Sequence, residues 1–240
     1  MANVIITGNV IVQGARSNVQ YANVISTPSW RISAPSTWPN LTPTFSAGWS
    51  HAAAVQQDGT VWTWGLNTSG QLGIGIAGGS RNTPVQVSLF STATAVSCGS
   101  AHTAVVLSDG TVWTWGVNTN GQLGINISGG SRNTPVQVTT VSAATMVSCG
   151  GNHTVSLSSA GTVYAWGANN NGQLGINSTS TMLTPTAITF SSAGTTYINA
   201  GGDMTGIIYD GYVYTFGSNA NGALGINVTG GTRQTPTQID

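Results

Sequence analysis

The chain has 240 residues, and 40% of them are hydrophobic, enough to bury a sizeable core. Only 4% are Asp, Glu, Lys or Arg, whereas an ordinary soluble domain carries about 25%. Five arginines balance five aspartates, and Lys and Glu do not occur, so the chain lacks the basic surface that nucleic-acid binding requires. The 33 glycines and eight tryptophans indicate turns and packed strands and exclude a charge-rich, disordered chain.

The first 43 residues are predicted to form a hairpin followed by an extended arm. Apolar residues at 4–6 and 10–12 flank a Thr-Gly-Asn turn, and several prolines punctuate the stretch that contains Trp30 and Trp38. A lone hairpin is marginally stable in water, so we expect residues 1–43 to be an attachment or oligomerisation segment. We expect neither a signal peptide nor membrane insertion, because no cationic stretch or long apolar run is present.

From residue 44 onward, one sequence unit recurs four times at intervals of 50 or 51 residues. Each copy contains an aromatic residue followed by glycine and then a phrase close to Asn-x-x-Gly-Gln-Leu-Gly. The aromatic positions are Trp64, Trp115, Trp166 and Phe216. A period of this length indicates supersecondary units that are too small to bury their own apolar faces, so neighbouring units must cover one another.

Each unit is predicted to contain four antiparallel strands. Three short apolar or β-branched runs are separated by glycine and by Asp-Gly pairs, which suit tight hairpin turns. A fourth strand follows a glycine-rich connection, and we expect it to begin at a proline on the sheet edge, because proline cannot donate to a central ladder. These prolines are Pro84, Pro135, Pro185 and Pro236.

Several motifs stand at fixed distances within each unit. In the second copy they are Gly-Ser-Ala-His-Thr at 99–103, Asp-Gly-Thr-Val at 109–112, Trp-Gly at 115–116 and Asn-Thr-Asn-Gly-Gln-Leu-Gly at 118–124. Together they resemble the repeat of the regulator of chromosome condensation family. The resemblance covers residues 44–240 and implies an all-β fold, a β-propeller with four blades of four antiparallel strands. The fourth copy departs from the pattern, with Met204 in place of His and Ala223 in place of Gln.

Propellers of this family usually have seven blades, whereas this chain encodes four. A four-blade arc leaves two open blade faces. The four blades can close on themselves, a second copy can complete a ring or stack, or a different protein can cover the faces. Because the missing charge also favours association, we expect a homo-oligomer or a complex with other structural proteins.

Three histidines, His51, His102 and His153, hold equivalent positions in consecutive units. A zinc site would require them to converge within about 2.1 Å of one ion, although each lies on a different blade. We therefore expect all three, like the four aromatic positions, to be structural, with each imidazole bonded to neighbouring backbone. No metal or other cofactor is expected.

Three arginines, Arg81, Arg132 and Arg233, lie on equivalent loops. The planar guanidinium suits bidentate contacts, so these residues are candidates for binding a carboxylate or a sugar acid, for example on a glycan or a host surface. The alternative is that each arginine bonds carbonyl groups of its own or the next loop.

Catalysis is not expected. No serine lies in a nucleophile-elbow sequence, glutamate is absent, and Asp58, Asp109 and Asp210 belong to predicted turns. Cys98 and Cys149 occupy the same position in consecutive units, and we expect them to be small buried fillers.

Composition and resemblance favour different functions. A polar, nearly uncharged surface without an export signal predicts a structural or adhesive virion subunit, such as a bacteriophage capsid-decoration or tail component, located on the virion or another extracellular surface. The family resemblance implies the alternative of a cytoplasmic protein-interaction module that binds a GTPase or another partner. A third interpretation is ultraviolet sensing, since the family includes a plant photoreceptor whose repeated motif is similar to Gly-Trp-Ser-His at 48–51.

Overall fold

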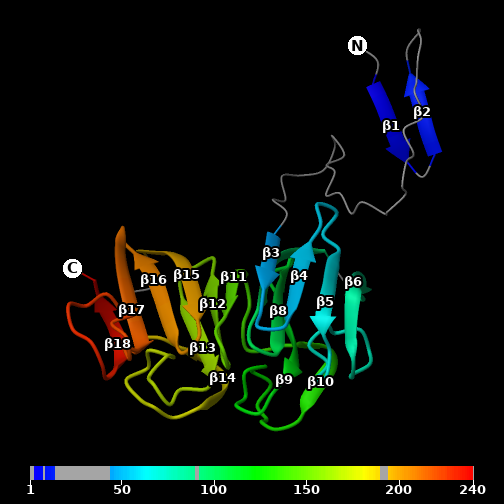
Figure 1. Ribbon diagram of the computed structural model, residues 1–240. Helices are drawn as coiled ribbons and strands as arrows, with labels where there is room; N and C mark the ends of the chain where they lie inside the picture. The colour runs from blue at the N-terminus through cyan, green and yellow to red at the C-terminus, as the bar shows by residue number, and fades with distance from the viewer. Residues whose placement is uncertain (1–2, 8, 14–43, 90–91, 190–193, 240) are drawn as a thin grey trace. The chain divides into compact units, whose positions relative to one another are not determined.

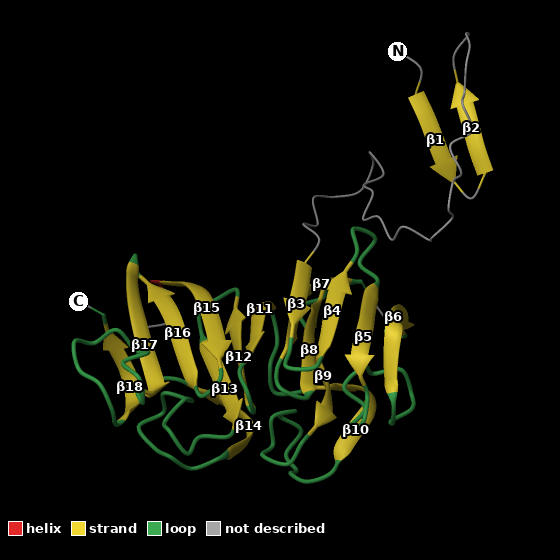
Figure 2. Ribbon diagram, in the orientation of Figure 1, coloured by secondary structure: helices red, strands yellow, loops and turns green. Residues whose placement is uncertain are grey.

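The computed structural model describes residues 3–7, 9–13, 44–89, 92–189 and 194–239. Within these ranges the chain forms β-strands joined by turns and loops, without an α-helix (Figures 1 and 2). The predicted all-β fold is therefore confirmed. The chain divides into two compact units, residues 1–31 and 32–240.

The first unit contains the predicted hairpin. Strands β1 (Asn3–Thr7) and β2 (Asn9–Gln13) pair in antiparallel register. The extended arm predicted to follow them lies outside the described residues, so the role of residues 1–43 in attachment stays a prediction.

The second unit contains four sheets, each a meander of four antiparallel strands in chain order, which we call blades 1 to 4. Blade 1 comprises β3 (Thr44–Ala47), β4 (His51–Val55), β5 (Val61–Leu66) and β6 (Ser80–Val87), and blade 2 comprises β7 (Ala93–Cys98), β8 (His102–Leu107), β9 (Val112–Val117) and β10 (Ser131–Gln137). Blade 3 comprises β11 (Ala144–Cys149), β12 (His153–Ser158), β13 (Val163–Gly167) and β14 (Met182–Ala187), and blade 4 comprises β15 (Thr195–Gly201), β16 (Met204–Tyr209), β17 (Tyr212–Ser218) and β18 (Thr232–Gln238). Consecutive blades contact each other through their first strands, and the predicted four-by-four arrangement is confirmed.

The fourth strand of each blade lies at the sheet edge, as predicted, but it begins earlier than its proline. Strand β6 starts at Ser80, before Pro84, and its register against β5 shifts between Thr63 and Gly65. Proline therefore sits beside a bulge, where the ladder requires no amide donor. The same shift occurs in β10, β14 and β18.

The apolar core is divided among the interfaces between consecutive blades. Trp115 of blade 2 packs in a cluster with Val55 and Val61 of blade 1. Trp166 fills the next interface and Phe216 the third, and all three rings are fully buried. Blades 2 to 4 thus each bury an aromatic ring against the preceding blade, as a repeat of units with incomplete cores requires.

The aromatic ring packs directly against the glycine of the Gln-Leu-Gly phrase of the preceding blade, and we call this packing site the seat. Gly73 has a φ of 69°, and a Cβ at this position would lie 2.7 Å from Trp115 Nε1. A larger residue is excluded both by the left-handed backbone and by the approach of the ring. Gly124 and Gly175 hold Trp166 and Phe216 in the same way.

A buried hydrogen-bond chain also joins each blade to the next. His51 Nε2 lies 2.9 Å from Thr103 Oγ1, and that hydroxyl donates to the Gln71 carbonyl oxygen at 2.9 Å. Because the hydroxyl hydrogen points to Gln71, the oxygen accepts from His51, which therefore carries a hydrogen on Nε2. Trp115 Nε1 donates to the same Gln71 oxygen at 2.9 Å.

The same chain of hydrogen bonds recurs at the other two interfaces. Its members are His102, Thr154 and Gln122, and then His153, Thr205 and Gln173. The partner of each Nε2 is thus a threonine hydroxyl of the next blade, whereas we expected backbone from the sequence. The histidines reach across the interfaces and tie the blades together.

Burial keeps these imidazoles neutral. Desolvation lowers the pKa from 6.5 to about 4 for His51, about 3 for His102 and about 4 for His153, and the two other imidazoles lower the pKa of His102 further. Nδ1 of each ring has no hydrogen-bond partner among the described residues, so a proton added there would be buried without an acceptor.

Replacing the middle member of one hydrogen-bond chain should weaken the fold. Thr154→Val leaves His102 Nε2–H buried without an acceptor, and we expect a loss of about 1–3 kcal/mol in the free energy of unfolding, measured by urea denaturation. The double variant His102→Met/Thr154→Val removes both partners and should be more stable than Thr154→Val alone. The control is Thr140→Val on the surface; equal stability of this control and Thr154→Val would contradict the role of the hydrogen-bond chain.

Stability should also depend on pH through the histidines. Their folded pKa values lie below the unfolded value near 6.5, so the unfolded state binds more protons between about pH 4 and pH 6.5. We expect full stability above pH 6.5 and a fall below it, by at most about 1.4 kcal/mol per pH unit for each histidine. His153→Met, which copies Met204 of blade 4, should reduce this pH slope by about one third; an unchanged slope would show that His153 is not the titrating group.

Candidate interaction site

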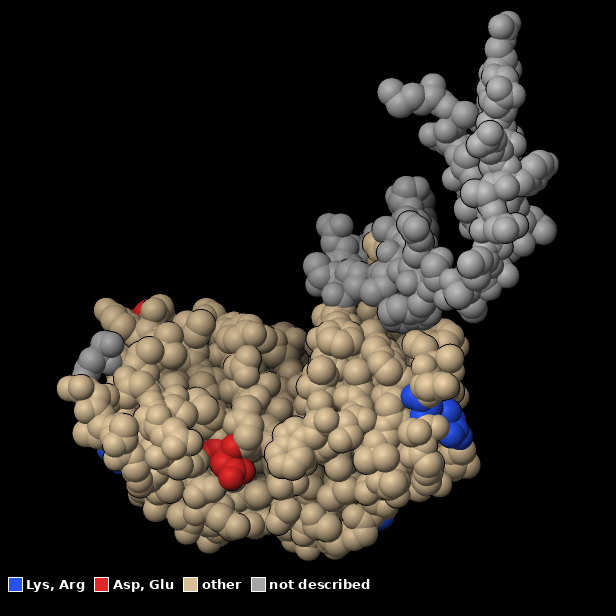
Figure 3. Space-filling model, in the orientation of Figure 1, with Lys and Arg blue, Asp and Glu red and all other residues tan. Residues whose placement is uncertain are grey.

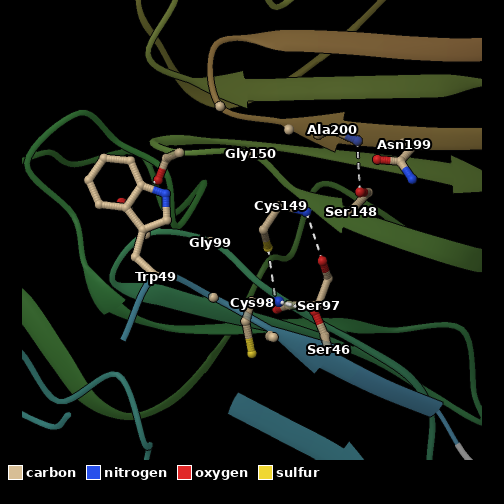
Figure 4. A pocket seen from close by; sticks show the side chains of 16 residues that line it. Ser46, Trp49, Ser97, Cys98, Gly99, Ser148, Cys149, Gly150, Asn199 and Ala200 are labelled. Carbon is tan, nitrogen blue, oxygen red and sulfur yellow. Dashed lines mark hydrogen bonds between the residues drawn. The ribbon is translucent and has the colours of Figure 1, made fainter. Parts of the chain in front are cut away.

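The first strands of the four blades surround a pocket of about 340 Å³ (Figure 4). It is lined by the ends of β3, β7, β11 and β15 and by the turns that follow them. Because every blade contributes to the lining, we call it the axial pocket. Its residues are serine, cysteine, alanine, glycine and asparagine, with Trp49 as the one large side chain.

Serine hydroxyls fix the wall of the axial pocket. Ser46 Oγ accepts from the Cys98 amide at 2.9 Å, and Ser97 Oγ accepts from the Cys149 amide at 2.9 Å. Ser148 Oγ accepts from the Ala200 amide in the same way, as the dashed lines in Figure 4 show for the last two pairs. Since an accepting hydroxyl keeps its own hydrogen, the wall can still offer O–H donors to a bound group.

The two cysteines are placed as expected from the sequence. Both are free thiols buried in the wall, and burial raises the pKa of Cys98 and Cys149 to about 12. The thiolate form is therefore suppressed at neutral pH, which disfavours nucleophilic or metal-binding chemistry at these residues.

The rim of the pocket is formed by the turn that joins the first and second strands of each blade. Trp49 occupies this turn in blade 1 and is 80% exposed, whereas Ser100, Gly151 and Gly202 stand at the same place in the other blades. Figure 4 shows the indole beside the pocket. An exposed indole next to a polar depression can anchor a binding partner.

One carboxylate lies near this rim. Asp203 of blade 4 is exposed, and its two oxygens accept from Asn171 Nδ2 at 3.2 Å and Gln173 Nε2 at 3.4 Å. Asn152 takes the equivalent place in blade 3 and accepts from Gln122. The carboxylate thus continues the contacts between blades.

The other described aspartates hold turns, as predicted. Asp109 Oδ1 accepts from the Thr111 hydroxyl and amide, and these two bonds lower the pKa of the carboxyl. Asp58 makes the same pair of bonds with Thr60.

The three arginines are not brought together by the fold. They lie on the outer strands β6, β10 and β18 of different blades, and Met182 replaces arginine in blade 3. Each Nη1 donates to the carbonyl of the preceding residue at 3.0–3.1 Å; the arginines are Arg81, Arg132 and Arg233. This is the local role considered as the alternative above, and their part in ligand binding stays a prediction.

The surface is nearly free of charge, as Figure 3 shows for one face. Among the described residues, no group of His, Cys, Asp or Glu side chains is arranged to hold a metal ion. In the same residues we find no helix long and apolar enough to cross a membrane. Trp49 was missed as a site residue; an aromatic residue at a turn where other repeats have serine or glycine was the available signal.

Curated proteins match just over half of this chain. The chain is 38% identical over 139 residues to the probable E3 ubiquitin-protein ligase HERC3 of Homo sapiens, covering 56% of this chain and 13% of that protein. It is 37% identical over 134 residues to the ultraviolet-B receptor UVR8 of Arabidopsis thaliana, covering 54% and 30%. The chain therefore spans less than a third of these relatives.

Solved structures agree on the fold. Human WBSCR16 superposes with a TM-score of 0.74 at 21% identity, covering 82% of this chain and 52% of that one. Yeast RCC1 (Prp20), solved with Kap60, superposes with a TM-score of 0.73 at 19% identity, covering 85% and 50%.

These relatives overturn the prediction of a virion subunit on an extracellular surface. The curated relatives described here are a probable ubiquitin-protein ligase and an ultraviolet-B receptor, and neither is a capsid or tail component. Composition misled because polar, uncharged residues have an interior role in this fold. The buried Asn67, for example, accepts from the Leu72 amide and donates to the Ile76 carbonyl.

A sequence model of the RCC1-like domain matches residues 6–240, which is nearly the whole chain. The repeats, the blades and the comparisons agree with the resemblance recognised in the sequence. The chain belongs to the RCC1-like domain family.

Proposed function

We propose that the chain is a protein-interaction module that binds a segment of a partner protein over the axial pocket. The observation that carries this proposal is the 80% exposure of Trp49 at the pocket rim. An exposed indole leaves a large apolar surface in contact with water, which burial against a partner would remove. Tryptophan is also enriched among the residues that contribute most to binding energy.

The chemistry of the pocket favours an uncharged, polar segment. Its lining contains no Asp, Glu, Lys or Arg, and the serine hydroxyls of its wall can donate to peptide carbonyl groups. With five aspartates in the whole chain, a strongly basic partner finds little complementary charge.

The relatives support a protein partner without specifying it. Yeast RCC1 was solved bound to Kap60, and Prp20p is described with binding properties toward Gsp1p and histones. Small GTPases are therefore the first partner class to test. This chain spans only 13% of HERC3, so ligase activity is not part of the proposal.

Removing the indole should weaken partner binding without loss of stability. Immobilised wild-type chain, Trp49→Ala and Ile127→Ala would be compared for capture of purified small GTPases and of proteins from a lysate. Ile127 is also exposed but lies on an outer loop, which makes it the matched control. We expect Trp49→Ala to lose at least about tenfold in affinity and Ile127→Ala to bind as the wild type does; equal capture by all three would contradict the proposal.

A further inference from the structure

The three internal interfaces define what each flank of a blade binds. The flank facing the following blade supplies the Gln-Leu-Gly seat, the histidine and one loop amide. The flank facing the preceding blade supplies the aromatic ring, the threonine and a carbonyl on the outer strand. The amide of Asn126, for example, donates to the Leu183 carbonyl at 3.0 Å, and that of Asn177 donates to the Gln234 carbonyl at 2.8 Å.

Blade 4 exposes the flank that in blades 1 to 3 faces the following blade, and the structure describes no blade beyond it. Gly225 is exposed where Gly73, Gly124 and Gly175 are buried, and a Cβ there would meet only Ile239 Cγ2, at 3.6 Å. Val213 is 37% exposed, whereas its counterparts Val61, Val112 and Val163 are buried.

The loop of blade 4 is also preformed for a further blade. Asn227 has a φ of 58°, close to the 61° of Asn126 and the 55° of Asn177. Its backbone thus has the conformation in which the amides of Asn126 and Asn177 donate to the following blade. A depression of about 240 Å³ lies beside Asp203 and Ala223, where the corresponding sites of blades 2 and 3 meet the turn of the following blade.

Blade 1 exposes the flank that in blades 2 to 4 faces the preceding blade. Trp64 is half-buried, whereas its counterparts Trp115, Trp166 and Phe216 are fully buried against a preceding blade. Phe45 packs on Trp64 with ring centroids 5.9 Å apart and is 64% exposed. The counterparts of Phe45, each paired to the second strand in the same register, are the buried Val96, Val147 and Ile198.

Residues of the two open flanks differ from the repeat in matched ways. Met204 replaces the histidine on blade 4, and Ala52 replaces the threonine on blade 1, so neither flank would leave a buried polar partner unsatisfied if they met. Phe45 is larger than the Val or Ile of the other blades, and Gly206 on the facing flank is smaller than the Ala53, Ala104 and Val155 of the other blades. Size and polarity thus fit each other across this junction.

We propose that blade 4 of one copy binds blade 1 of a second copy, in a head-to-tail interface that repeats the internal ones. Trp64 of the second copy enters the seat at Gly225, and Phe45 packs against Val213. Such an interface joins unlike surfaces, so two copies close a ring when both junctions form, and larger assemblies result when they do not close. This association does not depend on the partner binding proposed above.

Light scattering coupled to size-exclusion chromatography tests the proposal on the full chain. The wild type should have at least twice the mass of one chain at high concentration. Phe45→Asp blocks one flank and Val213→Asp blocks the other, so each variant alone should be monomeric. An equimolar mixture should recover dimers, because Val213→Asp retains an intact blade 1 and Phe45→Asp retains an intact blade 4.

Ile127 of blade 2 has an exposed fraction of 45%, between those of Val213 and Phe45, and Ile127→Asp should associate as the wild type does. Circular dichroism and thermal unfolding show that each variant is folded. A wild type that stays monomeric at all concentrations overturns the proposal. Failure of the folded variants to complement each other would overturn the head-to-tail arrangement.

Discussion

The structure depends on one carbonyl oxygen per interface, which receives two donors from the following blade. At Gln71 these are the indole of Trp115 and the hydroxyl of Thr103, and the hydroxyl in turn accepts from His51 of the same blade as Gln71. The contact is polar and buried, and its side-chain polar atoms are hydrogen-bonded except for the histidine Nδ1 atoms. It fixes the register of one blade on the next, because the ring must also fit against Gly73.

This arrangement explains why so little charge is needed. Buried Asn, Gln, Thr and His side chains bond loop backbone within a blade or reach a neighbouring blade. Neutral hydrogen bonds, rather than ion pairs, therefore orient one blade on the next. A neutral surface also lacks the repulsion that keeps copies apart. Low charge also weakens the electrostatic repulsion between copies at the two exposed flanks.

The repeat was sufficient to predict the blades, their strand number and the edge position of the fourth strand. Periodicity and turn residues carry that information locally. The partner of each histidine could not be predicted, because Thr103 and His51 are neighbours only after two blades pack. The early start of β6 depends on a bulge that Pro84 permits, which the proline alone does not reveal. Trp49 occurs at a turn where the other repeats have serine or glycine, but its place beside the axial pocket and its exposure become visible only after the four blades have packed.

The packing that joins the blades also explains the apolar residues on the outer flanks of blades 1 and 4. A flank that packs on a neighbouring blade at the internal interfaces exposes apolar residues where the structure describes no blade against it, as Val213 of blade 4 and Phe45 of blade 1 show. The most direct measurement of the underlying contact is a long-range ¹H–¹⁵N correlation spectrum of the three histidine rings near neutral pH. All three should be neutral and protonated on Nε2, since each ring donates to a threonine. Rings protonated on Nδ1, or charged imidazolium rings, would contradict the hydrogen-bond chain that holds the blades together.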